Sequence, residues 1–269
     1  MNPPLQRFGA GGDHVDAASS RVSRKRQDAA STYDVDLAIR WLGRMNFSDA
    51  LALQEEIVAR KRTDENSVDE LLLLEHDPVY TIGRTPDQSS LLAAKQLPHP
   101  LFTINRGGQA TYHGPGQLIG YPIVDLRRCG QDLHKYLRWL ERTLIEFLAD
   151  YEIVATQRDG LTGVWVGPPS QSASPARTSG AASSRKIASI GVGVRHWITM
   201  HGFALNVCGD LSPFSNIVPC GISNVVMTSM ESEMKGSVSV ADVAMAFEKF
   251  VLRKMSNLRV ADVEKATLV

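Results

Sequence analysis

One cysteine lies between a proline and a glycine in the stretch VPCGI at positions 218–222. This setting favours a fixed and accessible backbone at Cys220, and Gly221 offers an unobstructed N–H beside the thiol. A cysteine thiolate is a strong nucleophile, so the position suits covalent chemistry. The alternative is a small buried apolar side chain, the common fate of a free cysteine. That alternative fits Cys208 and Cys129 better than Cys220.

A lysine begins the apolar run Lys186-Ile-Ala-Ser-Ile-Gly191. Lysine is rarely buried, so a solvent-exposed side chain at the edge of a strand is the simpler interpretation. In the alternative, Lys186 is partly desolvated in a pocket. There its pKa falls and it acts as a base, or it stays charged beside a thiolate. The run by itself leaves both interpretations open.

A glycine-rich stretch, RGGQATYHGPGQ at 106–117, lies between two predicted strands. Glycines let a backbone approach a ligand closely, so this stretch can hold an extended substrate. It can equally be a turn-rich connection in which His113 hydrogen-bonds the backbone. The segment Thr199–Asn206 mixes glycine with apolar residues. It suits either the wall of a fatty-chain pocket, with room left by Gly202, or a plain core strand.

The spacing of apolar residues along the chain predicts the helices and strands that must position these side chains. The leucines between 133 and 148 fall on one helical face. Ser48 is expected to cap a helix to about residue 62, and Ser239 with Asp242 resembles a capping box before a helix that buries Val240, Val243, Phe247 and Val251. Strands are expected at 71–75, 79–83, 101–105, 118–126, 152–156, 163–167, 187–194 and 198–207. This mixture predicts an α/β or α+β domain on a mixed, largely antiparallel sheet with flanking helices.

Two low-complexity segments interrupt the pattern. Residues 1–33 are expected to form a disordered cytoplasmic extension, and 167–185 a mobile loop inside a single domain over 34–260. The formal net charge is zero and the sequence pI is about 7.1, which gives no case for binding nucleic acid or a membrane. Three cysteines without a CxxC pair indicate neither a disulfide framework nor a structural zinc site.

The motifs in this order resemble those of the lipoyl(octanoyl) transferases. The resemblance rests on RGGQATYHGPGQ at 106–117, KIASIGV at 186–192, HGFALN at 201–206 and PCGI at 219–222. The stretch LLLLEHDPVYTIGR at 71–84 is similar to the early strands of the family. The resemblance extends from about residue 40 to 255 and implies a fold similar to the catalytic domains of lipoate and biotin protein ligases.

The resemblance also implies an activity and its residues. Octanoyl would pass from octanoyl-acyl carrier protein to a lysine of a lipoyl domain, in 2-oxoacid dehydrogenase complexes or in the glycine cleavage H protein. Cys220 would carry the acyl group as a thioester, and Lys186 would lower its pKa and relay protons. The substrate site would be lined by Arg106, Gly107, Gly108, Gln109, Ala110, Thr111, Tyr112, His113, Ser189, Ile190, Gly191, Gly202, Phe203 and Ala204.

The chemistry of acyl transfer indicates what each of these side chains and backbone groups would do. An ordinary thiol is only about 3% thiolate at pH 7, so a nearby ammonium would favour the reactive form. The N–H of Gly191 or Gly221 would hold the oxyanion, and Lys186 or His113 would take the proton of the acceptor amine. No cofactor, metal or nucleotide is required, because a thioester already stores the free energy. An acidic carrier would be met by basic residues such as Arg84, Arg127, Arg128, Lys135 and Arg138.

Other functions remain open at this stage. An ATP-dependent lipoate or biotin ligase of the same fold would not need a nucleophilic thiol. A thiol hydrolase would use water in place of the amine, and a non-catalytic acyl-binding module would not need the Lys186 and Cys220 pair. A metal site built from His113, His201 and Cys220 does not match usual zinc spacing.

Overall fold

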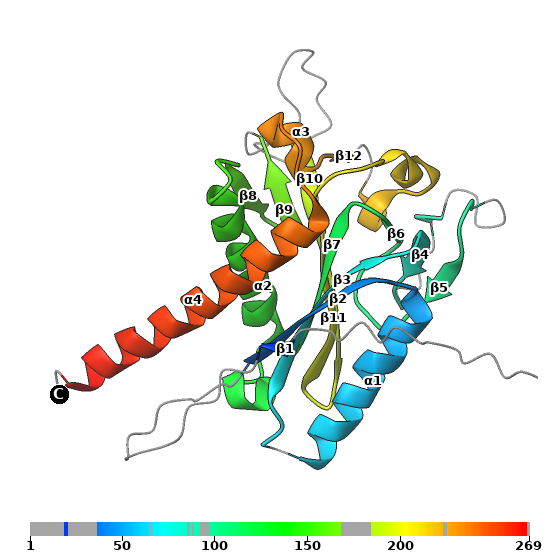
Figure 1. Ribbon diagram of the computed structural model, residues 1–269. Helices are drawn as coiled ribbons and strands as arrows, with labels where there is room; N and C mark the ends of the chain where they lie inside the picture. Colours follow the sequence, from blue (N-terminus) through cyan, green and yellow to red (C-terminus); the bar gives the residue numbers. More distant parts are fainter. Residues whose placement is uncertain are drawn as a thin grey trace, which may run out of the picture.

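The computed structural model describes residues 19–20, 37–64, 66–84, 87, 89–91, 97–167, 184–222 and 225–267, with only the backbone described at 19–20 and 256–267. Within these residues, strands form a large mixed sheet with helices on both faces (Figure 1). Its order is β1 (Ser19–Ser20), β2 (Leu37–Met45), β3 (Asp69–His76), β7 (Gln117–Ile123), β11 (Ile198–Asn206), β10 (Arg185–Arg195), β9 (Leu161–Val166) and β8 (Ala155–Arg158), and β12 (Val226–Met227) pairs with β10.

A smaller sheet lies beside the large one (Figure 1). It has the order β5 (Leu101–Thr103), β4 (Val79–Ile82) and β6 (Thr111–His113). The pairs β2–β3, β10–β12 and β4–β5 are parallel, and the other strand pairs are antiparallel. The predicted mixed, largely antiparallel sheet with flanking helices is confirmed.

Helices cover the two faces of the large sheet (Figure 1). Helix α1 (Phe47–Thr63) packs on one face, and helices α2 (Leu133–Ala149) and α4 (Val240–Thr267) pack on the other. Central strand β3 is therefore apolar along its length: Leu71 and Leu73 join the core under α2 and α4, whereas Leu72 and Leu74 join the core under α1. A continuous apolar run is typical of a strand that is buried on both faces.

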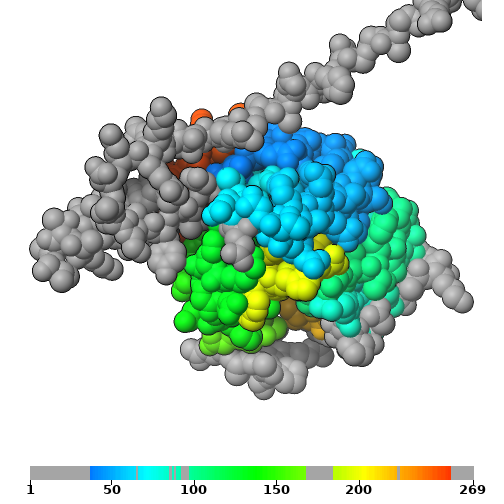
Figure 2. All heavy atoms as spheres, turned by 90° about the horizontal axis from the view of Figure 1, so that it is seen from below, coloured from blue at the N-terminus to red at the C-terminus, as the bar shows by residue number. Residues whose placement is uncertain are grey.

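Seen from below, residues from distant parts of the chain meet on one surface (Figure 2). The yellow end of the β10–β11 hairpin lies there between the cyan end of α1 and green residues from the middle of the chain. A backbone hydrogen bond of 2.8 Å from Leu126 N–H to the Trp197 carbonyl ties the hairpin end to the 3₁₀ turn η2 (Leu126–Cys129). The hairpin that carries much of the predicted site is thus anchored at its tip.

Several sequence predictions need correction in detail. The segments at 71–75 and 79–83 are strands, but β3 lies in the large sheet and β4 in the small one. Strand β7 ends at Ile123, and β8 begins at Ala155 rather than at 152. The glycine-rich stretch contains the unexpected strand β6. Further short elements are η3 (Ser212–Asn216), η4 (Pro219–Gly221) and α3 (Met230–Met234).

Of the two predicted helix caps, the one before α4 is confirmed and the one before α1 is wrong. Before α4, the Asp242 N–H donates to Ser239 Oγ at 3.1 Å, as the capping prediction requires. For α1 the prediction was wrong, because the cap is Asn46, whose Oδ1 accepts the Asp49 N–H at 2.9 Å. Ser48 lies inside the helix and is exposed.

Some predictions fall on residues that are not described. The disordered extension over 1–33 lies outside the described residues except Ser19–Ser20, which pair with Arg40 and Ile39 of β2. The loop over 167–185 also lies outside them except at its ends, where Arg185 already belongs to β10. Among the described residues, no helix has the length and apolar character needed to cross a membrane.

The corrected cap of α1 can be tested directly. Replacing Asn46 with alanine removes the acceptor for the Asp49 N–H, so the free energy of unfolding should fall by about 1 kcal/mol. Ser48→Ala in the same exposed first turn should change it by less than about 0.5 kcal/mol. Urea denaturation followed by circular dichroism measures both. Equal losses in the two variants would contradict the assignment of the cap.

Candidate active site

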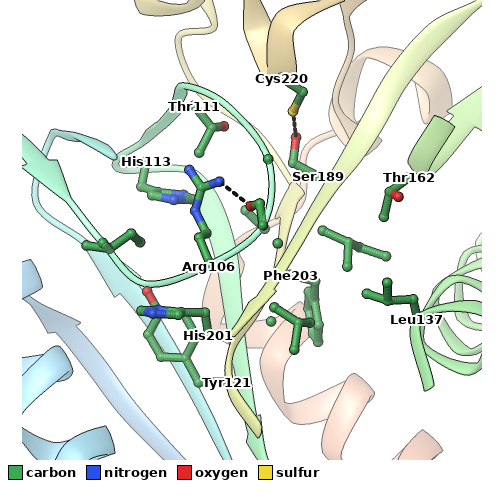
Figure 3. Close-up of a pocket in the computed structure, with 18 of the residues that line it drawn as sticks. Arg106, Thr111, His113, Tyr121, Leu137, Thr162, Ser189, His201, Phe203 and Cys220 are labelled. Atoms are coloured by element: carbon green, nitrogen blue, oxygen red, sulfur yellow. Dashed lines mark hydrogen bonds between the residues drawn. The ribbon is translucent and has the colours of Figure 1, made fainter. Parts of the chain in front are cut away.

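The stretches predicted to carry chemistry meet at one cavity of about 310 Å³ (Figure 3). Its wall is formed by the glycine-rich stretch, the central parts of β10 and β11, the start of α2, the β8–β9 turn and the turn η4. From the predicted set, the lining residues are Arg106, Gly107, Gly108, Thr111, His113, Ser189, Ile190, Gly191, Gly202, Phe203, Ala204 and Cys220.

Cys220 occupies a fixed turn at the edge of this cavity. Its backbone adopts the left-handed conformation with φ of 55°, which is uncommon for a residue other than glycine. Its N–H donates a 2.9 Å hydrogen bond to the carbonyl of Ala110, which ties the turn to the glycine-rich stretch. The side chain is half-buried, and its Sγ lies 3.9 Å from Ser189 Oγ (Figure 3).

Lys186 reaches the same sulfur from β10. It is fully buried, which excludes the solvent-exposed alternative. Its Nζ lies 3.3 Å from Cys220 Sγ and donates a 3.1 Å hydrogen bond to the Thr162 carbonyl. The Trp165 ring centroid is 5.2 Å from Nζ, within the range of a cation–π contact. The structure therefore brings together the thiol and the amine that the sequence placed thirty-four positions apart.

A glycine in β9 makes room for this lysine. A Cβ at Gly163 would lie 2.6 Å from Lys186 Cε and 2.7 Å from the Ala188 carbonyl oxygen, and its φ of 126° is itself unfavourable for other residues. The Gly163 N–H donates to the buried carboxylate of Glu141 at 2.9 Å. Gly163 was not among the predicted site residues, although an isolated glycine in a strand often marks the close approach of another group.

The surroundings of Cys220 favour its thiolate. Burial by itself raises the pKa of the thiol, but the charge and hydrogen bond of Lys186 oppose it, followed by the charge of Arg106 and the Ser189 hydrogen bond. The net result is a pKa below the ordinary value for cysteine. For Cys208 and Cys129, in contrast, burial raises the pKa and neighbouring carboxylates raise it further.

The histidines around the cavity are uncharged at neutral pH. Burial lowers the pKa of His113 to about 3, helped by His76 and Arg106. Burial likewise lowers the pKa of His201 and of His76 to about 4. With such a low pKa, His113 is a weak base and does not suit the role of proton acceptor that the sequence allowed for it.

Arg106 supplies a second buried cation. Its side chain donates to the Gly107 carbonyl at 2.9 Å and to the Thr81 carbonyl and hydroxyl at 3.0 and 2.9 Å. These bonds fix the guanidinium, which lies inside the curve of the glycine-rich stretch (Figure 3). A Cβ at Gly191 would lie 2.9 Å from Arg106 Cδ, so that glycine makes room for the arginine. Arg106 thus adds positive potential near the sulfur.

Three predicted lining residues lie behind the cavity wall. Tyr112 is buried in the core of the small sheet against Tyr80 and Phe214. Ala110 contributes only the carbonyl that accepts the Cys220 N–H. Gln109 packs over Gly221, because a Cβ added at Gly221 would lie 2.5 Å from Cδ of the Gln109 amide. Alternation along β6 explains the position of Tyr112, because neighbouring strand residues face opposite sides, whereas Gln109 and Ala110 precede that strand.

Gly202 lines the cavity for a different reason from the one expected. A Cβ there would lie 2.2 Å from the Gly120 carbonyl oxygen and 2.6 Å from Pro122 Cδ. The glycine is therefore needed for the close approach of β11 to β7. It does not serve mainly to leave room for a fatty chain.

Other lining residues were not predicted. Leu133 and Leu137 belong to the apolar face of α2, which the sequence revealed without showing what it faces. Tyr121, His201 and Thr162 are polar contributors from β7, β11 and β9. The remaining lining residues are Phe47, Ile104, Gly160, Leu161, Val192 and Ile222. Of these residues, Val192, His201 and Ile222 lie inside the quoted motifs, whereas the others belong to no motif and only the fold brings them to the cavity.

Most of the residues that were expected to form a basic surface are in ion pairs with carboxylates of the same chain. Arg127 pairs with Asp125, Arg128 with Asp69, Lys135 with Asp132 and Arg138 with Glu141. Arg84 is exposed. Most of these side chains therefore have carboxylate partners within the chain, which weakens the case for them as a docking patch. Within the described residues, no three His, Cys, Asp or Glu side chains are grouped so that they could hold a metal ion.

Solved structures share this fold. A bi-partite lipoate protein ligase from Thermoplasma acidophilum superposes with a TM-score of 0.59 and 17% identity, over 81% of this chain and 83% of that chain. A lipoate-protein ligase A bound with ATP gives 0.54 and 18%, over 79% and 84%. At such identities the likeness concerns the fold alone. The architecture is that of a lipoate ligase catalytic domain, as the resemblance implied.

Comparison with the sequences of known proteins identifies the family more narrowly than the fold does. The family described as the lipoyl protein ligase A/B catalytic domain matches residues 46–251. An octanoyltransferase of Geotalea uraniireducens is 45% identical over 202 residues, or 75% of this chain and 85% of the relative. One from Geobacter sulfurreducens is 47% identical over 208 residues, or 76% and 79%. The chain belongs to the lipoyl protein ligase A/B catalytic domain family, among its octanoyltransferases. It is an acyltransferase.

The charge of Lys186 can be tested through the thiol. In Lys186→Met the opposing charge is lost while burial persists, so the pKa of Cys220 should rise and its alkylation at pH 7 should slow at least about tenfold. The rate of iodoacetamide alkylation against pH, followed by peptide mass spectrometry, should move its midpoint to higher pH. Lys135→Met removes an exposed lysine as the control. An unshifted midpoint in Lys186→Met would refute the role of the ammonium.

Proposed function

We propose that this chain transfers an octanoyl group from octanoyl-acyl carrier protein to a lysine of lipoyl domains, through a thioester on Cys220. The observation that carries the proposal is the 3.3 Å separation of Lys186 Nζ from Cys220 Sγ. The pair lies beside a cavity that is lined in part by the apolar side chains of Leu137, Ile190, Val192 and Phe203. The octanoyltransferase relatives support the acyl group. A ligase that activates a free acid with ATP has no use for this pair.

In the first half-reaction, the Cys220 thiolate attacks the carbonyl carbon of the carrier thioester. A bond forms between Sγ and that carbon, and the bond to the carrier sulfur breaks. The leaving carrier thiolate takes a proton from the Lys186 ammonium, whose Nζ already lies next to the reacting sulfur. The products are the octanoyl thioester on Cys220, a neutral Lys186 amine and the free carrier thiol.

In the second half-reaction, the neutral amine of the acceptor lysine attacks the thioester on Cys220. An amide forms, and the Cys220 thiolate leaves. The proton released from the attacking nitrogen goes to the neutral Lys186 amine, which restores the original ion pair. With its pKa of about 3, His113 is too weak a base for this step. The two half-reactions therefore balance with Lys186 as the proton carrier.

A hydroxyl is proposed to hold the oxyanion. The N–H of Cys220 donates to the Ala110 carbonyl and that of Gly221 to the Val218 carbonyl at 3.0 Å, so neither is available. Thr111 Oγ1 is buried, lines the cavity and makes no hydrogen bond within the described part of the chain. Thr111 directly follows Ala110, which holds the Cys220 turn. Its hydroxyl suits the developing charge.

The proposed partners follow from the relatives. One structurally similar protein is described together with its E2 lipoyl domain. We propose lipoyl domains of 2-oxoacid dehydrogenase complexes and the glycine cleavage H protein as acceptors, and the acyl carrier protein as donor. Because most of the predicted basic residues are paired internally, recognition of the carrier is proposed to rely chiefly on the cavity and the thioester.

The proposed mechanism can be tested by looking for the octanoyl thioester on Cys220. Mixing the protein with octanoyl-loaded carrier protein, without ATP, should add one octanoyl group, which tandem mass spectrometry should map to Cys220. Cys220→Ala should abolish the adduct, whereas Cys208→Ala should retain it, since the surroundings of Cys208 raise its pKa. An adduct that persists at an unchanged rate in Cys220→Ala would overturn the proposed mechanism. Addition of a lipoyl domain should then discharge the adduct to the acceptor lysine.

The oxyanion proposal predicts a loss of catalysis without a loss of thiol reactivity. Thr111→Val keeps the shape of the side chain but removes the hydroxyl, so kcat should fall about a hundredfold. Thr111→Ser should recover most of the rate. The alkylation rate of Cys220 should stay the same in both variants, because the Lys186 contact is untouched. Equal kcat values for Thr111→Val and the native chain would exclude the hydroxyl as donor.

A further inference from the structure

A second, larger cavity lies on the face of the large sheet that α2 covers, and α2 also lines the active-site cavity. The second cavity measures about 420 Å³ and is enclosed by β2, β3, β7, α2 and α4. Its lining is mostly apolar, although the buried side chains of Asp69 and Thr143 also contribute, and the more exposed Asp132 and Lys135 lie at its rim. Its apolar lining residues include Leu71, Pro122, Tyr136, Leu140, Phe247 and Val251.

The two cavities follow one another along α2. Leu133 and Leu137 line the active-site cavity, and Tyr136 and Leu140, on the adjoining strip of the same helix, line the second cavity. Among the described residues, Phe203 is the one side chain that lines both. Its ring is therefore the partition between them, at the apolar end of the site, away from Cys220 (Figure 3).

The partition is held in place on two sides. Phe203 pairs with Gly120 of β7, where an added Cβ would lie 2.2 Å from the ring. Because glycine has no side chain, Gly120 leaves the space that the Phe203 ring occupies. On the other side, the Phe247 ring of α4 lies 5.3 Å away between centroids at an interplanar angle of 64°. Phe203 is 4% exposed, so its ring cannot turn aside into solvent.

We infer that Phe203 sets the length of the acyl chain that this enzyme accepts. An acyl group on Cys220 extends along Ile190, Val192 and Leu137 and ends against the Phe203 ring. A longer straight-chain fatty acyl group needs space beyond the ring, and the second cavity supplies an apolar space of that kind. A cavity of about 150 Å³ holds a benzene-sized group, so 420 Å³ takes several further methylenes. This inference rests on the proposed function.

The test compares acyl donors of different length on the full chain. Carrier proteins loaded with octanoyl, decanoyl and dodecanoyl groups are offered to the native chain and to Phe203→Ala, and kcat/KM for acylation of a lipoyl domain is measured. Each additional methylene that reaches apolar surface favours binding about fourfold. The ratio of dodecanoyl to octanoyl transfer should therefore rise more than tenfold in Phe203→Ala.

Phe250→Ala is the matched control, since Phe250 belongs to the same core cluster and lines neither cavity. Its ratio should stay within about twofold of the native ratio. If octanoyl transfer persists in Phe203→Ala but the ratio does not change, the partition hypothesis is wrong while the proposed function stands. If the native chain transfers no octanoyl, the proposed function itself fails. Thermal denaturation verifies folding, and Phe203→Val replaces the alanine variant if that variant is unfolded.

Discussion

A fully buried ammonium group is unfavourable unless nearby groups compensate for its lost hydration, and Lys186 is such a group. Three contacts compensate it: the Thr162 carbonyl, the face of Trp165 and the sulfur of Cys220. The stabilisation is mutual, because the same charge favours the thiolate against the opposing effect of burial. The Cys220 thiolate and the Lys186 ammonium therefore stabilise each other, and each explains why the other is tolerated in a partly apolar environment.

The surrounding fold serves to keep this pair together. Gly163 gives Lys186 its space, and the bulge between Lys186 and Ala188 allows β10 to pass β9 at that point. Cys220 is held from the opposite side, through the hydrogen bond of its N–H to Ala110 in the glycine-rich stretch. The large sheet thus supplies the amine and the glycine-rich stretch fixes the turn of the sulfur. Their relative position depends on how closely these two parts pack.

The cavity combines two environments with separate tasks. Near the sulfur, Arg106 and Lys186 provide positive charge, while His113 and His201 stay neutral because burial lowers their pKa values. Charge that develops on a thioester oxygen is therefore met by cations and by fixed dipoles. Beyond β10 the wall becomes apolar and ends at Phe203. In the proposed reaction, different physical forces would thus bind the reacting atoms and the hydrocarbon tail in this cavity.

The sequence by itself determined the local features: the amphipathic face of α2, most of the strands, and the motifs that contain Cys220, Lys186 and Arg106. Such features depend on near neighbours along the chain, which periodicity and glycine placement reveal. Tertiary structure alone decided that Lys186 is buried, that Gly163 admits it, and that Tyr112 faces the small core instead of the cavity. It also placed Phe203 between two cavities. These outcomes depend on strand register and on packing between residues far apart in the chain, and no local pattern specifies either.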